Sequence, residues 1–146
     1  MYERILVPTD DSAGAMAAAE LAVDLASQYD ATIHVLFVVD TTSLPADVTA
    51  TYVDEALEEV GERATRGVVE LADEAGVETA PVEIASGAPH REILAYADEH
   101  DVDLIVMGTH GRRGLDRLLV GSVTEKVVRL SDVPVLTTRA PKEETE

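Results

Sequence analysis

Residues Leu104 to Thr124 read LIVMGTHGRRGLDRLLVGSVT, the most informative part of the sequence for both fold and site. Its apolar start is too short for a helix and indicates a buried parallel strand. Gly108 and Gly111 can turn the backbone sharply after that strand, because glycine adopts positive φ without a Cβ penalty. Gly121-Ser122 stands at the expected start of the next helix, where N–H groups without helical partners favour an anion. One strand is therefore followed by two groups of amides that together can bind a chain of phosphates.

Basic side chains are concentrated in the same stretch. The whole chain of 146 residues has a net charge of −18. Between Gly108 and Arg129, five basic and two acidic residues give +3, so the rest of the chain carries −21. Exposed charges more than about 8–10 Å away are screened, so an anion can be received here despite the acidic remainder. The alternative is that these arginines face water and pair with carboxylates. The stretch is not a Walker A loop, since no Gly-Lys-Ser/Thr follows at the required spacing.

The composition limits the class of protein and its partners. Apolar residues make up 46% of the sequence, which indicates a globular chain. We expect residues 1–140 to form a single domain and residues 141–146 a charged tail. No apolar run approaches the ~20 residues that span a bilayer, and neither a cysteine nor a signal peptide is seen, so we expect a cytoplasmic location. The acidity argues against nucleic acid or an anionic membrane as a partner.

The choice of charged residues predicts a high-salt environment. The chain has nine Arg but only two Lys, and it has no cysteine. Together with the acidity, this is typical of salt-accumulating halophiles, in which salt screens the repulsion between carboxylates. We therefore expect a haloarchaeal source, and an ordinary acidic bacterial protein is the alternative.

Apolar periodicity along the chain predicts strands that alternate with helices. We expect strands at Arg4–Pro8, Thr32–Val39, Val77–Ala85, Leu104–Met107 and Pro134–Thr138. We expect helices at Ala13–Gln28, at Tyr52–Ala75, from Pro89 to His100 and at Ser122–Leu130, with a loop at Asp40–Thr49. This alternation predicts an α/β fold. We expect a flavodoxin-like or Rossmann-like three-layer sandwich, in which a five-stranded parallel sheet of order 3-2-1-4-5 is covered by four helices.

The predicted strand order places the first and fourth strands side by side. The chain reverses direction between them, and ligands of such sheets bind at that point, beyond the carboxyl ends of the strands. Pro8-Thr9-Asp10 lies at the end of the first strand, and Gly108-Thr-His-Gly111 lies at the end of the fourth. The topology and the glycine spacing therefore indicate the same crevice independently.

Three segments carry a family resemblance. The pattern Gly-x2-Gly-x9-Gly-Ser is complete as Gly108, Gly111, Gly121 and Ser122. The opening Ile5-Leu-Val-Pro-Thr-Asp10 and the closing Val133-Pro-Val-Leu136 belong with it. Over essentially its whole length the chain resembles the universal stress protein family, and the complete glycine pattern is similar to the branch that binds ATP.

The resemblance implies an adenine nucleotide, ATP or another adenylate, bound together with Mg²⁺ or Mn²⁺. It also implies a homodimer through the last strand, Val133–Thr138, which would pair antiparallel with its twin and so remove an exposed edge. The nucleotide-binding residues that it implies are Pro8, Thr9, Asp10, Val38, Met107, Gly108, His110, Gly111, Arg112, Arg113, Gly114, Gly121, Ser122, Val123 and Thr124.

The resemblance also implies a role for each part of this set. Residues 8–10 would line the adenosine, and Asp10 would contact the ribose or the nucleotide-bound metal ion. Val38 would offer backbone groups to adenine. Residues 108–114 would wrap the ribose and phosphates, to which residues 122–124 would donate N–H and hydroxyl groups. Gly114 is a glycine that the pattern does not require, and it would loosen the loop and weaken binding.

Several candidate residues have plainer explanations. Asp10 and Ser12 can simply cap the first helix. His110 lies in a glycine loop, where we expect it to donate to a phosphate or face solvent, and we expect no catalytic residue. The other histidines lie in different expected elements without metal-ligand spacing, so a zinc site built by the protein is not expected. They are His34, His90 and His100.

The leading functional hypothesis is a nucleotide-responsive stress or signalling module that acts through an unknown protein partner. ATP would order the loop Thr41–Thr49 and the glycine loop and so shift the population of conformations. A slow ATPase or nucleotide hydrolase in the same crevice is the alternative, although no water-activating base stands out. A response-regulator receiver is rejected, because Ala85-Ser-Gly87 and Thr138-Arg139 stand where its phosphoacceptor Asp and its Lys are needed. A flavin module would rest on the fold alone.

Overall fold

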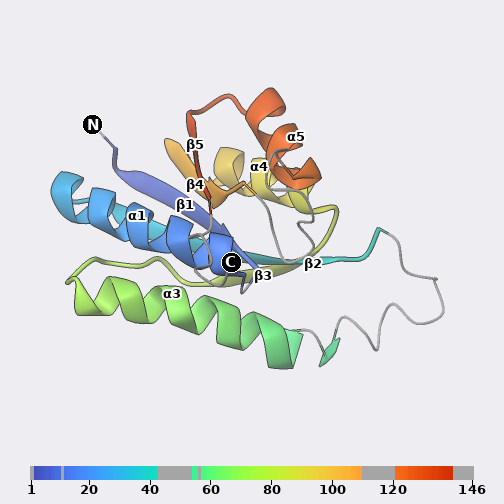
Figure 1. Cartoon of the computed structure of the whole chain (residues 1–146), viewed down its shortest axis with the longest axis horizontal. Helices are drawn as coiled ribbons and strands as arrows, with labels where there is room; N and C mark the ends of the chain where they lie inside the picture. The colour runs from blue at the N-terminus through green and yellow to red at the C-terminus, as the bar shows by residue number, and fades with distance from the viewer. Residues whose placement is uncertain (1, 11, 43–53, 56, 110–120, 140–146) are drawn as a thin grey trace, which may run out of the picture.

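Figure 1 shows the computed structural model, which describes residues 2–10, 12–42, 54–55, 57–109 and 121–139. The strands are β1 Arg4–Thr9, β2 Thr32–Asp40, β3 Glu83–Gly87, β4 Leu104–Gly108 and β5 Val135–Thr138. The helices are α1 Ala13–Tyr29, α3 Glu62–Glu74, α4 Pro89–Glu99 and α5 Ser122–Leu130, and a π-helical turn, η1, covers Leu57–Gly61. Among the described residues, no helix is both long and apolar enough to cross a membrane.

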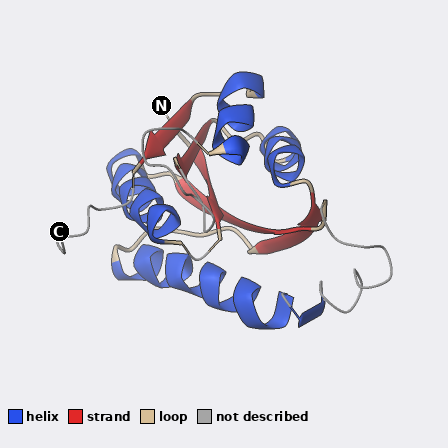
Figure 2. Cartoon of the chain, turned by 45° about the vertical axis from the view of Figure 1, so that its right-hand side comes forward, coloured by secondary structure: helices blue, strands red, loops and turns tan. Residues whose placement is uncertain are grey.

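The five strands form one parallel sheet in the order β3-β2-β1-β4-β5. Helices α1 and α3 cover one face of the sheet, and α4 and α5 cover the other (Figures 1 and 2). The central strand β1 pairs with β2 from Arg4 to Thr9 and with β4 at Ile5 and Leu6. The predicted fold class, strand order and four helices are therefore confirmed.

Alternation along β1 divides the apolar core between the two faces of the sheet. Ile5 and Val7 pack in the cluster under α1 and α3, whereas Leu6 packs in the cluster under α4 and α5. All three side chains are fully buried. Side chains of a strand point alternately to opposite faces, so a parallel sheet covered on both sides needs apolar residues at consecutive positions. This requirement is why the short apolar runs of the sequence identify the strands.

The third strand begins later than the sequence predicted. Val77 is not in a strand: its N–H donates to the carbonyl of Ala72 at the end of α3 (2.8 Å), and its side chain is buried. Thr79 then makes an isolated parallel bridge to Ile33. Pro81 has no N–H and interrupts the ladder, so regular pairing with β2 starts at Glu83. The expected strand Val77–Ala85 is thus wrong in its first half.

The predicted helix Tyr52–Ala75 is not uniform. Residues 54–55 are helical, and the π-helical turn η1 precedes α3. After α3, Gly76 adopts a φ of +72°, the left-handed conformation expected of a glycine that terminates a helix. Residues 43–53, including most of the predicted loop Asp40–Thr49, lie outside the described residues, as do 110–120 and the predicted tail 141–146.

Candidate functional site

The described helices that follow the neighbouring strands β1 and β4 lie on opposite faces of the sheet. From β1 the chain continues into α1 on one face of the sheet, and the helix that follows β4, α5, lies on the other face (Figure 1). The carboxyl ends of the two strands therefore form the switch point that the sequence predicted. In sheets of this kind a ligand binds beyond these ends.

A polar side chain caps the helix that follows β1. Ser12 is the N-cap of α1, and its hydroxyl accepts the N–H of Ala15 (3.1 Å). One carboxylate oxygen of Asp10 accepts the N–H of Ser12 (3.1 Å). These oxygens of Asp10 and Ser12 therefore cap α1, as the alternative explanation from the sequence proposed, because they accept N–H groups at the start of the helix. Thr9 is buried, and Asp10 is half-buried at the mouth of the switch point.

The start of α5 has a different construction. Gly121 is its N-cap, and within the described part of the chain no side chain caps it. The N–H of Gly121 donates to the carbonyl of Thr109 (2.7 Å), and the N–H of Glu125 donates to that of Gly121 (2.9 Å). Ser122, Val123 and Thr124 come before this first helical hydrogen bond, so their N–H groups have no partner within the helix. Together with the helix dipole, they make this end of α5 suited to an anion.

The structure explains why residue 108 is a glycine, and this reason was not predicted from the sequence. The φ of Gly108 is not positive, contrary to the expected turn; instead, its backbone lies against the first turn of α1. A Cβ atom on Gly108 would lie 2.9 Å from the carbonyl carbon of Gly14. The carbonyl of Gly108 accepts the hydroxyl of Thr124 from α5 (2.7 Å). Gly108 thus contacts both helices that begin at the switch point.

Thr124 differs from its expected role. Its side chain is 3% exposed, and its hydroxyl hydrogen is donated to Gly108, whereas the resemblance implied donation to a phosphate. The backbone N–H of Thr124 is the group that remains for a ligand. Sequence could have indicated this, because Thr124 stands three residues before the buried Val127 and so shares its helix face.

The other expected residues fall into three groups. Met107 is buried in the core beneath α4 and α5, and Val38 packs against the same cluster, so only their main chains are open to a ligand role. Pro8 is half-buried in β1, where it pairs with Leu36 of β2. The expected residues outside the described part are His110, Gly111, Arg112, Arg113 and Gly114.

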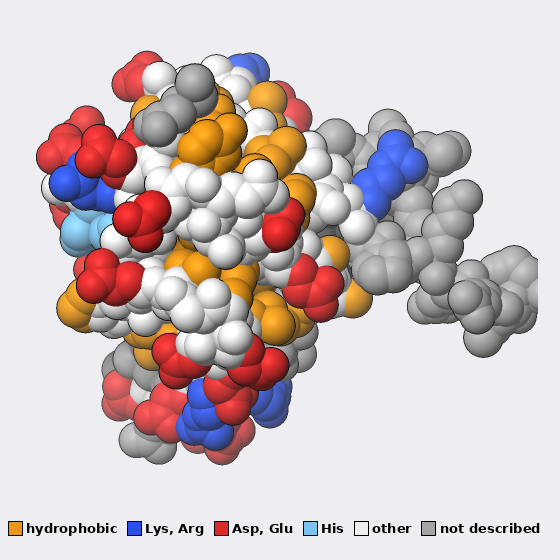
Figure 3. Space-filling view, turned by 90° about the vertical axis from the view of Figure 1, so that its left-hand side faces the viewer, with side chains coloured by type: hydrophobic (Ala, Val, Ile, Leu, Met, Phe, Trp, Pro, Cys, Tyr) orange, Lys and Arg blue, Asp and Glu red, His pale blue; other side chains and the backbone are white. Residues whose placement is uncertain are grey.

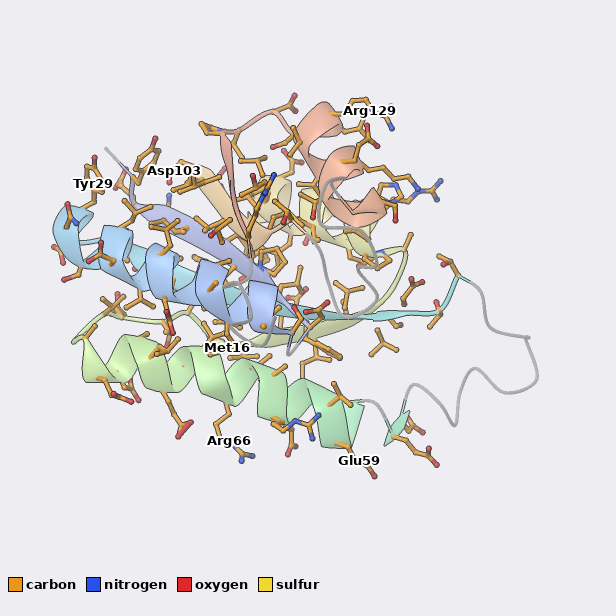
Figure 4. All side chains as sticks on the ribbon, viewed as in Figure 1. Met16, Tyr29, Glu59, Arg66, Asp103 and Arg129 are labelled. Atoms are coloured by element: carbon orange, nitrogen blue, oxygen red, sulfur yellow. The ribbon has the colours of Figure 1, made fainter. Side chains whose placement is uncertain are left out.

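Positive charge near α5 is partly neutralised. The guanidinium of Arg129 forms an exposed ion pair with Glu125 (2.9 Å), and Figure 4 shows it on the outer side of the helix. Exposed pairs of this kind contribute little to stability. Arg129 therefore adds less to anion attraction than the net charge of the segment suggests.

A cluster of aromatic and titratable side chains lies near the amino ends of the strands, away from the switch point. The buried His34 shares a 2.7 Å hydrogen bond between Nδ1 and the hydroxyl of Tyr96, and the Tyr96 ring stacks on His100 with centroids 3.8 Å apart. His34 and His100 lie only 5.9 Å apart between ring centroids, which sequence spacing did not predict. Burial lowers the pKa of His34, with smaller contributions from His100 and Arg4. Burial, assisted by Glu83, raises the pKa of Tyr96.

A hollow of about 310 Å³ near the amino ends of the strands does not coincide with the expected site. It lies between the carboxyl ends of α1 and α3 and is lined by residues that include Asp30 and Glu78. Figure 3 views this end of the molecule and shows acidic side chains distributed over it. Carboxylates repel a phosphate, so we assign no nucleotide to this hollow. Among the described residues, no group of three or more His, Asp or Glu is arranged to hold a metal ion.

Comparison with known proteins identifies relatives over the whole chain. The model of the universal stress protein family matches residues 1–139. Universal stress protein MJ0531 of Methanocaldococcus jannaschii is 39% identical, over 99% of this chain and 86% of its own length. The structure of universal stress protein UspA from Lactobacillus plantarum is similar, with a TM-score of 0.81 at 31% identity, over 94% of this chain and 98% of that chain. A universal stress protein solved in complex with cAMP has a TM-score of 0.69 at 26% identity, over 96% of this chain and 99% of that chain.

Proposed function

Since the chain belongs to the universal stress protein family, we propose that it binds an adenine nucleotide, ATP foremost, at the carboxyl ends of β1 and β4. The observation that carries the proposal is the start of α5, where three N–H groups without helical partners face the switch point between neighbouring strands. The related structure in complex with cAMP supports the same ligand class. In this proposal the protein acts as a cytoplasmic, nucleotide-responsive module rather than as an efficient enzyme.

The proposed roles follow the geometry of the described residues. The N–H groups of Ser122, Val123 and Thr124 receive the phosphates, since they are the groups that helix geometry leaves without partners. The main chain of Val38, near the end of β2, borders the adenine. Asp10 keeps one oxygen on Ser12, and its carboxylate is the group that would orient the ribose or a nucleotide-bound Mg²⁺ or Mn²⁺.

We also propose that the protein forms a homodimer through β5. This strand lies at an edge of the sheet, and an edge that exposes unpaired backbone groups invites pairing with another chain. Exposed apolar side chains accompany it: Leu136 of β5 is 37% exposed, and Val128 and Leu130 of α5 are 51% and 50% exposed. Antiparallel pairing of two β5 strands would cover both the edge and these side chains. A protein partner would bind to the surface of this dimer.

The nucleotide proposal is tested by identifying what the protein retains. Purified protein in high KCl, which screens its carboxylates, is denatured, and the released small molecules are analysed by mass spectrometry. We expect an adenine nucleotide. Isothermal titration of stripped protein with ATP measures the affinity directly. A protein that releases no adenylate and shows no binding to ATP, ADP, AMP or cAMP in high KCl contradicts the proposal.

Gly121→Val tests whether the phosphates bind at the start of α5. Gly121 has φ −63° and ψ 158°, a conformation that any residue adopts, so valine brings no backbone strain there. An N-cap side chain lies beside the first N–H groups of its helix, so the branched valine should crowd the phosphates proposed to bind there. We expect loss of ATP binding with a cooperative thermal transition retained. ATP binding that is unchanged in Gly121→Val would show that the phosphates lie elsewhere.

A further inference from the structure

The hydroxyl of Thr124 is used inside the protein. It lies 2.7 Å from the carbonyl oxygen of Gly108, and the side chain is 3% exposed. A hydroxyl has one hydrogen to donate, and here that hydrogen connects the first turn of α5 to the end of β4. Thr124 therefore does not donate its hydroxyl to a ligand while this contact lasts.

The carbonyl that receives this hydrogen bond belongs to a fixed junction. The backbone of Gly108 lies against Gly14, in the first turn of α1, too closely for any Cβ atom to fit between them. The next residue, Thr109, accepts the N–H of Gly121 (2.7 Å) and donates its own N–H to Thr138 of β5 (2.9 Å). Both the Gly121 N–H and the Thr124 hydroxyl thus hold the start of α5 to the end of β4, and the end of β4 contacts α1 on one side and β5 on the other.

We propose that Thr124 is a positioning residue for the nucleotide site: by holding the amino end of α5 against Gly108, it fixes where the amides of Ser122 and Val123 point. This inference rests on the proposed nucleotide site and adds a device that sets its geometry. The backbone amides act on the ligand directly, and the side chain of Thr124 acts on it through them.

The physical basis is preorganisation. Without the hydroxyl, the carbonyl of Gly108 loses its buried donor, and the first turn of α5 loses one of the hydrogen bonds that hold it to the end of β4. The turn then samples several positions, of which only the original one presents the amides correctly to the ligand. The apparent affinity falls in proportion to the fraction of molecules that keep this position. Removal of any buried hydrogen bond lowers the stability of the whole protein. Here we expect an additional loss, in the affinity for the nucleotide.

The chain offers a close control for this distinction. Thr65 is also buried, and its hydroxyl donates to the carbonyl of Gly61 (2.8 Å), but it lies in α3. Thr124→Val and Thr65→Val both remove a hydrogen bond from a buried hydroxyl to a backbone carbonyl, but the bond of Thr65 is local, to carbonyls three and four residues earlier, whereas that of Thr124 joins α5 to β4. Thr124→Ser keeps the hydroxyl and tests whether the hydrogen bond, rather than the methyl group, matters.

The test combines titration with ATP and amide hydrogen exchange. We expect Thr124→Val to weaken ATP binding by about fivefold or more, Thr124→Ser to recover most of the affinity, and Thr65→Val to stay within about twofold of the wild type. In the ligand-free protein, Thr124→Val should speed the exchange of the Glu125 amide, which donates to Gly121, and Thr65→Val should not. Equal ATP affinity in Thr124→Val and wild type overturns the positioning role.

Failure of the proposed function gives a different result. If the wild type binds no adenine nucleotide, the nucleotide site is wrong, and the exchange data alone decide whether Thr124 holds the start of α5. Unchanged exchange at Glu125 in Thr124→Val would then refute the positioning role. Faster exchange there, with no change in Thr65→Val, would support it.

Discussion

Gly108 at the end of β4 and Gly14 in the first turn of α1 approach so closely that a Cβ atom on Gly108 would lie 2.9 Å from the carbonyl carbon of Gly14 and 3.0 Å from its oxygen. Both atoms belong to the backbone, so no side-chain rotation can relieve the overlap. Gly108 is therefore required by the packing of α1 on the sheet, whatever the site binds.

We expect Gly108→Ala to destabilise the protein by about 1–3 kcal/mol, the usual effect of forcing extra volume into a packed region. Because the strain falls between α1 and β4, the substitution should also displace the switch point and weaken nucleotide binding. Chemical unfolding monitored by circular dichroism measures the change. A variant as stable as the wild type would show that the two backbones are not in contact.

Gly67→Ala is the matched control, and its effect should have the opposite sign. A Cβ atom on Gly67 meets only the flexible end of Met16, at 3.6 Å, and Figure 4 shows Met16 between α1 and α3. Alanine in a helix interior is favoured over glycine by about 0.5–1 kcal/mol, so this variant should be more stable than the wild type. Destabilisation by Gly67→Ala would mean that α3 packs more tightly on α1 than the structure shows.

The stability of the protein should depend on pH through His34. Because burial lowers the pKa of His34, the unfolded chain holds the proton more readily between that lowered value and about 6.5. The contribution of neutral His34 is therefore complete above about pH 6.5 and is lost as the pH falls toward the folded pKa. His100, Arg4 and Tyr96 face this imidazole, so protonation would also place a cation beside two basic groups.

His34→Gln isolates this effect from the many carboxylates. Both proteins carry the same acidic residues, so the difference in their free energies of unfolding reports on His34. We expect the advantage of the wild type over the variant to shrink between pH 7.5 and pH 5, measured by chemical unfolding at constant salt. An advantage that stays constant or grows on acidification would contradict a lowered pKa.

Leu136→Lys should convert the proposed dimer to a monomer. A charged side chain on an edge strand opposes pairing with a second copy, and lysine adds no further negative charge to an acidic chain. Val82→Lys is the control, since Val82 is 38% exposed near β3, whereas Leu136 is 37% exposed on β5. Light scattering after size-exclusion chromatography gives the mass. A dimer that survives Leu136→Lys and dissociates in Val82→Lys would place the interface at the other edge.

The sequence predicted most of the fold because buried parallel strands leave a simple signal. Short apolar runs such as Leu104–Met107 are too short for a helix and fit a strand buried on both faces, and the helix at Ser122–Leu130 has the predicted bounds. The error at Val77 arose because an apolar residue can serve a helix end as well as a strand. Proline at 81 carried the correct signal, since it cannot donate to the ladder.

The switch point was predictable from the sequence, whereas the contacts around it were less so. Strand order and glycine spacing located the switch point, but the contact between Gly108 and Gly14 depends on how α1 lies on β4. Local spacing does not contain that information. The same applies to His34 and His100, which come from β2 and the end of α4 and meet only through the packing of that helix.

Backbone amide chemical shifts recorded while ATP is added show directly whether the nucleotide binds at the start of α5. We expect the largest changes at Ser122 and Val123, with further changes at Thr9 and Val38 near the carboxyl ends of the strands. Changes confined to the hollow near Asp30 and Glu78, or none with ATP in excess and salt held high, would contradict the proposed site.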